Sequence, residues 1–305
     1  MTTANNQRKL AFAALIAGNV TIAFGPLLVR YSDTGPIATG FWRMALAVPF
    51  LALLGYRAGF RLSHARPAIF GLVALAGLFF AIDIIAWHIG IFETKLGNAT
   101  LFANCASLLL VLYGVLVARA WPGRMQAAAV LLAFAGAALL MGQSLELSRA
   151  HFIGDLLCLA AGFAYTVYLI SMMRVRETTE SWSSLAMASL VVAAILLPAA
   201  LFAGEKVLPD LWWPLLLLAF SSQLFGQGCL TYALPHFSPL VIGLALLLQP
   251  ALSAAAGWAA FGEAMTPLDF LGSAMVMAAL VMVRLGESSN NKTAALSRQR
   301  HSAGE

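Results

Sequence analysis

The stretch FFAIDIIAWHIG, from Phe79 to Gly90, lies in a long apolar segment, residues 68–92, that carries a single acid, Asp83. A helix rises 1.5 Å per residue, so about 20 apolar residues cross the ~30 Å hydrocarbon core of a bilayer. The segment is therefore predicted to be a membrane-spanning helix. An acid inside such a helix is costly, and we expect it to pair, to contact water or to take part in function.

The rest of the chain has the same character. Of its 305 residues, 61% are hydrophobic and only 10% are charged, whereas soluble domains are about 25% charged. The fold class predicted is all-α integral membrane protein, with Leu10–Val29 as an uncleaved first helix. The ten predicted spans are 10–30, 37–55, 68–92, 97–118, 125–142, 153–173, 182–203, 211–234, 238–261 and 267–284.

Lys and Arg residues favour one side of these spans. With the N-terminus inside, the inner segments carry 13 of them and the outer loops carry Arg30, Lys95, Arg149 and Lys206. Cytoplasmic loops carry the excess of positive charge, so both termini are predicted to be cytoplasmic, in a bacterial inner membrane. The net charge of +5 does not indicate nucleic-acid binding, because the chain has no basic helix or aromatic-basic platform.

The ten spans divide into two sets of five. A shift of 143 residues brings spans three to five onto spans eight to ten without gaps, and Gly114 then meets Gly257. An odd number of spans per half makes the two halves inverted repeats, a plan that places a transporter's substrate site near the membrane midplane between them. The predicted organisation is a cytoplasmic N-terminus 1–9, a first repeat 10–142, a second repeat 153–284 and a disordered cytoplasmic tail 285–305.

These features resemble the EamA type of the drug/metabolite transporter superfamily. The resemblance rests on the ten spans in two halves and on four stretches over residues 10–284, namely GFWRMALAVPF (40–50), DIIAWHIGIFETKLGNATLFAN (83–104), GDLLCLAAGFAYTVYLI (154–170) and LLLQPALSAAAGWAAFGE (246–263). It implies an exporter of small metabolites or drugs, and aromatic amino acid exporters of the YddG type are one such identity. The repeat places Ser107 opposite Pro250, so the first half departs from the pattern there.

Two opposite charges are predicted to share a level in the membrane. Asp83 lies about 13 Å from the outer end of its span and Arg43 about 9 Å below the start of span two. An Arg43–Asp83 ion pair that orders the helices is one interpretation, and a substrate or proton site at Asp83 is the other.

The remaining candidates are aromatic, imidazole and amide side chains within the spans. Trp87 shares a face with Asp83 and suits either substrate stacking or the membrane interface. Pro250 removes a backbone N–H and is predicted to kink span nine, as a gating hinge or a static bend. The other predicted cavity residues, each with helix packing as the alternative role, are Asn19, His88, Asn104, Tyr165, Tyr168, Gln223, Gln227 and Gln249.

A secondary exporter working by alternating access is the function predicted, with aromatic amino acids or aromatic and cationic drugs among the candidate substrates. No nucleotide-binding loop of the form GxxxxGK[ST] occurs, and no cofactor or metal is expected. A facilitative, channel-like uniporter is the first alternative. A membrane-embedded enzyme is disfavoured, because HExxH, GxSxG and paired intramembrane aspartates are absent from the sequence.

Overall fold

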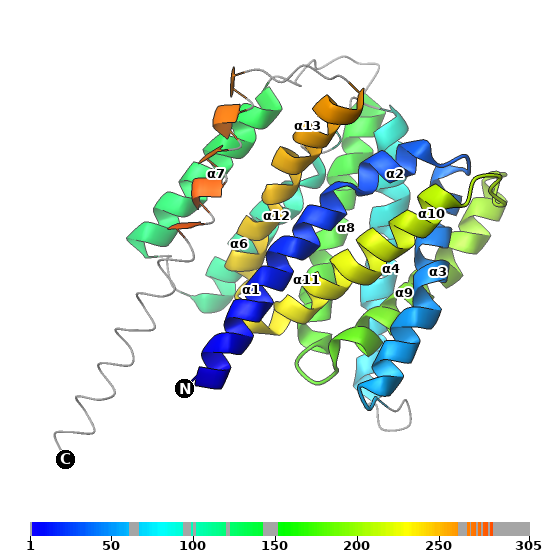
Figure 1. The fold of residues 1–305 in the computed structure, drawn as a ribbon, viewed down its shortest axis with the longest axis horizontal. Helices are drawn as coiled ribbons and strands as arrows, with labels where there is room; N and C mark the ends of the chain where they lie inside the picture. Colours follow the sequence, from blue (N-terminus) through cyan, green and yellow to red (C-terminus); the bar gives the residue numbers. More distant parts are fainter. Residues whose placement is uncertain are drawn as a thin grey trace.

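The computed structural model describes residues 2–60, 67–93, 99, 102–119, 123–142 and 152–261, with short helical pieces between 267 and 282. Within these ranges the regular structure is helical (Figure 1). The predicted tail 285–305 lies outside the described residues.

The first half begins with α1 (Thr2–Ala23) and α2 (Gly25–Tyr31), which together form the first span. The other helices of this half are α3 (Pro36–Arg57), α4 (Pro67–Glu93), α6 (Cys105–Ala118) and α7 (Arg124–Gly142). Prolines open α3 and α4, where a missing N–H costs nothing because the first turn has no acceptor for it. The helix α1 starts at Thr2, well before the span start predicted at residue 10.

The second half follows the same order. Its helices are α8 (Phe152–Val175), α9 (Ser181–Phe202), α10 (Trp213–Leu217), the π-helix Leu218–Gln227, α11 (Gly228–Ala233), a 3₁₀ turn (Leu234–His236), α12 (Pro239–Leu246) and α13 (Leu248–Phe261). From α10 to α11 the helical winding is continuous and forms the eighth span. The pieces after 267 include an apolar helix over 270–279.

Five of the described helices are long and apolar enough to cross a membrane by themselves: 6–31, 36–57, 67–93, 152–175 and 181–202. The others are shorter or broken apolar helices, and they complete the ten segments that hydropathy predicts. The chain is therefore an all-α, multi-pass membrane protein.

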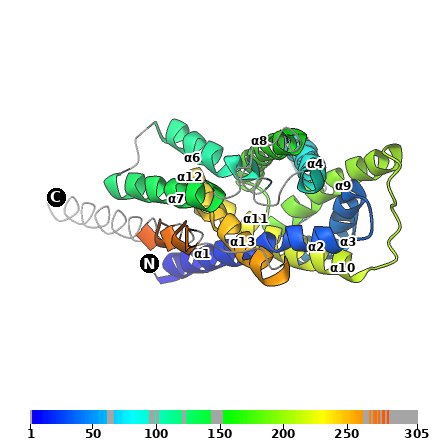
Figure 2. The same cartoon turned by 90° about the horizontal axis from the view of Figure 1, so that it is seen from above.

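Packing follows the two-fold relation between the halves. The helix α4 packs along α8, and the equivalent pair, α1 with the π-helix and α11, packs in the same way. Two further inter-half pairs, α3 with α9 and α6 with α12, join equivalent helices of the two halves, so the two-fold relation maps each pair onto itself. Seen from above, α1 and α2 lie along one side of the bundle, and α4, α6 and α8 lie along the other (Figure 2).

Candidate functional site

A cavity of about 90 Å³ lies between the two halves, lined by residues of α1, α2, α3, α4, α6, α8, the π-helix, α12 and α13. Its polar and charged lining residues come from both halves. They are Arg43, Asp83, Asn104, Ser107, Tyr165, Gln227, Gln249 and Ser253. Pockets for drug-sized ligands measure about 300–1,000 Å³, so in this state the cavity suits a much smaller solute.

Two broken helices meet at the cavity. Span nine is interrupted at Leu247, between α12 and α13, and span four is interrupted at Asn104, just before α6. These positions are 143 residues apart, as the repeat requires. In span nine Pro250 has no N–H to bond to the carbonyl four residues earlier, which belongs to Leu246. Span four breaks at the equivalent place although Ser107 replaces the proline, so the break is a property of both halves.

Arg43 and Asp83 both line the cavity, but no direct ion pair joins them in the described part of the chain. The Nε of Arg43 instead donates to Gln223 Oε1 at 3.1 Å, and the guanidinium lies over the Phe80 ring, 5.9 Å from its centroid. Arg43 is only 4% exposed. The two opposite charges thus line one cavity without the direct ion pair of the predicted brace, and the Arg43 Nε bonds to a neutral amide.

Asp83 has no hydrogen-bond or ion-pair partner among the described residues. Such a charge in a low-dielectric site is stabilised only by water, a ligand or a more distant opposite charge. The carboxylate is thus available to a solute in the cavity.

The amides that line the cavity are held by neighbours. Gln249 donates through Nε2 to Asn19 Oδ1 at 2.8 Å, which connects α13 to α1 across the two halves. Gln227 donates through Nε2 to the hydroxyl of Tyr165 at 3.2 Å. The Oε1 of Gln227 is buried and accepts no hydrogen bond from any described residue.

Aromatic rings form one wall. Phe80 stacks on Tyr168 with ring centroids 4.2 Å apart, and Tyr168 stacks in turn on Tyr165 at 5.6 Å. Phe80, Tyr165 and Trp87 line the cavity, whereas Tyr168 lies behind them. Aromatic faces of this kind pack against the apolar part of a solute.

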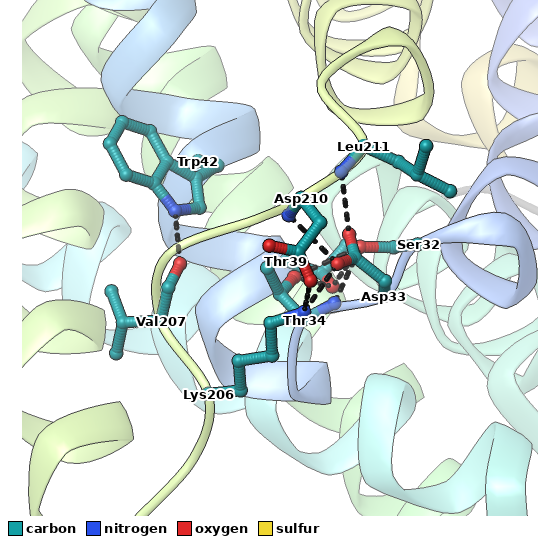
Figure 3. Close-up of polar contacts among 9 residues, drawn as sticks. All are labelled: Ser32, Asp33, Thr34, Thr39, Trp42, Lys206, Val207, Asp210 and Leu211. Carbon is teal, nitrogen blue, oxygen red and sulfur yellow. Dashed lines mark hydrogen bonds and ion pairs between the residues drawn. The ribbon is translucent and has the colours of Figure 1, made fainter.

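A second polar cluster joins the halves between the α2–α3 and α9–α10 connections (Figure 3). These connections lie at the end of the bundle away from the N-terminus (Figure 1). Lys206 Nζ pairs with Asp33 and with Asp210, and the Asp33 carboxylate also accepts from the backbone N–H groups of Asp210 and Leu211. These contacts, the Lys206 hydrogen bond first, lower the pKa of Asp33 to about 2. We call this group the end clamp.

Further contacts strengthen the end clamp. Glu205, from the second half, accepts hydrogen bonds from the backbone N–H groups of Ile37 and Ala38 and so caps α3 in the first half. Trp42 Nε1 donates to the carbonyl of Val207 at 2.7 Å. The two halves are thus fastened together at this end of the bundle.

Comparison with known proteins follows the same two-half division. The model of the EamA-like transporter family matches residues 9–142 and again residues 152–285. The chain belongs to the EamA-like transporter family. Both ends of the second match lie 143 residues after those of the first, from 9 to 152 and from 142 to 285, which confirms the repeat.

Individual relatives are more distant. The threonine/homoserine exporter RhtA of Escherichia coli (strain K12) is 27% identical over 255 residues, covering 79% of this chain and 80% of RhtA. An uncharacterized transporter of Archaeoglobus fulgidus is 26% identical over 247 residues, covering 77% of this chain and 83% of that protein. A solved crystal structure superposes with a TM-score of 0.75 over 92% of this chain and 98% of its own, at 16% identity. That last likeness shows the shared fold.

Within this family member the structure brings most of the predicted site residues together. Seven of them line the cavity: Arg43, Asp83, Trp87, Asn104, Tyr165, Gln227 and Gln249. Four predicted residues do not line it: Asn19, His88, Tyr168 and Gln223. Each of these four is fully or almost fully buried against protein.

Each residue outside the cavity contacts another part of the protein. His88 Nδ1 bonds to the carbonyl of Pro36 at 2.8 Å, because its side of α4 faces α3. Both ends of the Gln223 amide are engaged, by Arg43 and by Ser189 Oγ at 2.9 Å. Asn19 supports Gln249, so Asn19 and Gln223 are positioning residues rather than lining residues.

Among the polar and aromatic lining residues, the sequence interpretation missed three: Phe80, Ser107 and Ser253. Each stands three or four positions from a lining residue that it did identify, namely Asp83, Asn104 and Gln249 respectively. Residues at these spacings share a helix face, so extending each predicted residue along its own face would have found them.

Proposed function

We propose that this transporter exports small amino acids, and that it binds them as zwitterions between Arg43 and Asp83. The observation that carries the proposal is the presence of both charges on one cavity without a direct ion pair between them. A bound amino acid would place its carboxylate at the guanidinium and its ammonium at the aspartate. One small ligand would then neutralise both charges of a low-dielectric site.

Similarity supports the substrate class. RhtA is a threonine/homoserine exporter, and it aligns with this chain over most of both lengths. The size of the cavity, about 90 Å³, also favours small amino acids over aromatic amino acids or drugs. Trp87 and Tyr165 would then pack against the short side chain.

Alternating access would use the two helix breaks, at Asn104 and Leu247, as the flexible points beside the substrate. The Lys and Arg distribution predicts that both termini are cytoplasmic, and the end clamp would then lie on the outer side. Opening outward would require the clamp to rearrange.

The test is counterflow with the purified full-length chain in proteoliposomes. L-alanine should exchange saturably, whereas its amide (no carboxylate) and its N-acetyl derivative (no ammonium) should compete ten- to a hundredfold more weakly, since a charged hydrogen bond contributes about 1.5–3 kcal/mol. The isosteric variant Asp83→Asn should lose discrimination against the N-acetyl derivative, and Arg43→Gln should lose discrimination against the amide. Ser222→Ala, outside the cavity, is the matched control.

Three results would oppose this. Equal competition by alanine and both blocked analogues would exclude zwitterion binding. Flux without saturation or counterflow would favour the channel-like uniporter. If the double variant Arg43→Gln with Asp83→Asn restored transport lost in the single variants, the two charges would act on each other and not on a substrate.

A further inference from the structure

Two buried polar atoms on the cavity wall have no partner among the described residues: Ser107 Oγ and Gln227 Oε1. Ser107 is 0% exposed and Gln227 is 2% exposed. Buried polar groups are almost always hydrogen-bonded, so an exception at a cavity calls for an explanation.

Ser107, Ser181 and Ser222 are buried helical serines whose hydroxyls have no partner among the described residues, and of these three only Ser107 lines the cavity. Thr166, Ser184 and Ser221 each donate to the carbonyl four residues earlier. That is the ordinary way in which a buried helix satisfies such a group. Ser107 stands just after the break at Asn104 and makes no such bond. The hydroxyl thus has no acceptor in its own helix, on a residue that lines the cavity.

Gln227 supplies the complementary atom from the other half. Its Nε2 is used by the Tyr165 hydroxyl, which fixes the amide and leaves Oε1, an acceptor only. A serine hydroxyl can donate or accept. A solute hydroxyl in reach of both atoms would satisfy them together, because it would donate to Gln227 Oε1 and accept from Ser107.

We infer that Ser107 and Gln227 form a hydroxyl subsite, which makes side-chain-hydroxylated small amino acids the preferred substrates. The inference rests on the proposed function, since the amino acid backbone is assigned to Arg43 and Asp83. Buried polar groups of this kind are ordinarily satisfied by ordered water. A substrate hydroxyl can take the place of that water and form the same hydrogen bonds. A methyl group also expels the water but forms no hydrogen bonds, so both protein atoms lose their partner. A site that forms hydrogen bonds to a substrate hydroxyl discriminates strongly against the analogue that lacks this hydroxyl.

The nearly isosteric pair L-threonine and L-valine tests this. Both should exchange in proteoliposome counterflow, and threonine should compete about tenfold better, because valine would leave buried polar atoms without a partner. In Ser107→Ala the threonine preference should fall below about threefold because threonine binds less well. Gln227→Met, which keeps the length of the side chain, should act in the same direction. L-serine against L-alanine repeats the comparison with a smaller pair.

Ser222→Ala is the matched control. Its hydroxyl is equally buried and unpartnered, in the same span as Gln227, but does not line the cavity. It should keep the full threonine preference.

The measurements distinguish failure of the hydroxyl subsite from failure of the proposed amino acid transport. Equal competition by threonine and valine in the unmodified protein overturns the hydroxyl subsite and leaves amino acid transport standing. A threonine preference that survives both Ser107→Ala and Gln227→Met overturns the assignment to these two residues. If none of the four amino acids exchanges, the proposed function itself fails.

Discussion

Replacing Gln223 with leucine should disable the cavity without touching its surface. Gln223 is fully buried and does not line the cavity. It connects Arg43, on α3, to Ser189, on α9, through bonds of 3.1 Å and 2.9 Å. Leucine keeps the approximate volume and removes both bonds, so the Arg43 Nε loses its only partner among the described residues.

The cost follows from the two bonds. A hydrogen bond from a charged group contributes about 1.5–3 kcal/mol and a neutral one about 0.5–1.5 kcal/mol. Hydrogen bonds between membrane helices average only about 0.6 kcal/mol, so the lower ends apply and the total is about 2 kcal/mol. If Arg43 binds the substrate carboxylate, its misplacement should raise KM roughly tenfold, since about 1.4 kcal/mol corresponds to a factor of ten.

The assay pairs thermal unfolding in detergent with counterflow kinetics. The variant Gln223→Glu makes the test more specific. A carboxylate at this position would pair with Arg43 and compete with the substrate for the guanidinium. That variant should remain folded and yet bind substrate more weakly than the unmodified protein. Ser222→Ala, the adjacent buried hydroxyl without a partner, should change neither quantity. Unchanged KM in both Gln223 variants would refute the argument that Gln223 positions Arg43 for binding.

Other perturbations address packing, the end clamp and the break in span nine. Gly18→Ala should destabilise the fold by about 1–3 kcal/mol, because its Cβ would lie 2.7 Å from a backbone oxygen of the facing helix. Gly71 has open space around it, so Gly71→Ala should not destabilise the fold. Thermal unfolding of both variants would measure the difference. Asp33 has a lowered pKa, so its contribution is complete above its ordinary pKa and is lost as the pH falls through about 2. Transport between pH 5 and 8 should therefore be insensitive to this group, whereas Asp33→Asn should loosen the clamp, seen as faster proteolysis of the connection around Lys206. Pro250→Leu should restore a helical N–H at the break and reduce the maximal exchange rate more than it changes KM.

Hydropathy predicted the spans well because the bilayer imposes their length. The predicted span 37–55 is the helix Pro36–Arg57, and the span 68–92 is Pro67–Glu93. Broken helices are harder to predict. Pro250 signals the break at Leu247, but the first half has Ser107 in its place. The equivalent break at Asn104 has only the weaker signal of an asparagine, and the repeat is the better guide to it.

The site was predicted less completely, because polar residues inside a membrane protein have two uses that sequence alone does not separate. Arg43 and Gln227 reach the cavity, while His88 bonds to a backbone carbonyl and Gln223 serves Arg43. Whether a polar residue lines the cavity or bonds to protein depends on what its side of the helix packs against. That information lies in the packing of the two halves and not in the spacing within one helix.

The asymmetry of the charged site has a structural cause. The repeat places Gly226 opposite Asp83, yet an acid could not stand at Gly226, because a Cβ there would lie 2.8 Å from side-chain atoms of Thr21 and Ile22. On the other side, a Cβ on Gly18 would meet the Gly226 carbonyl at 2.7 Å. The π-helix and α1 are therefore held too close together for any side chain at that position. The equivalent contact, between α4 and α8, leaves room for Asp83 at the cavity. Among the described cavity residues the acid thus comes from one half only, and under the proposed function this asymmetry would fix a single orientation for a ligand with two different ends.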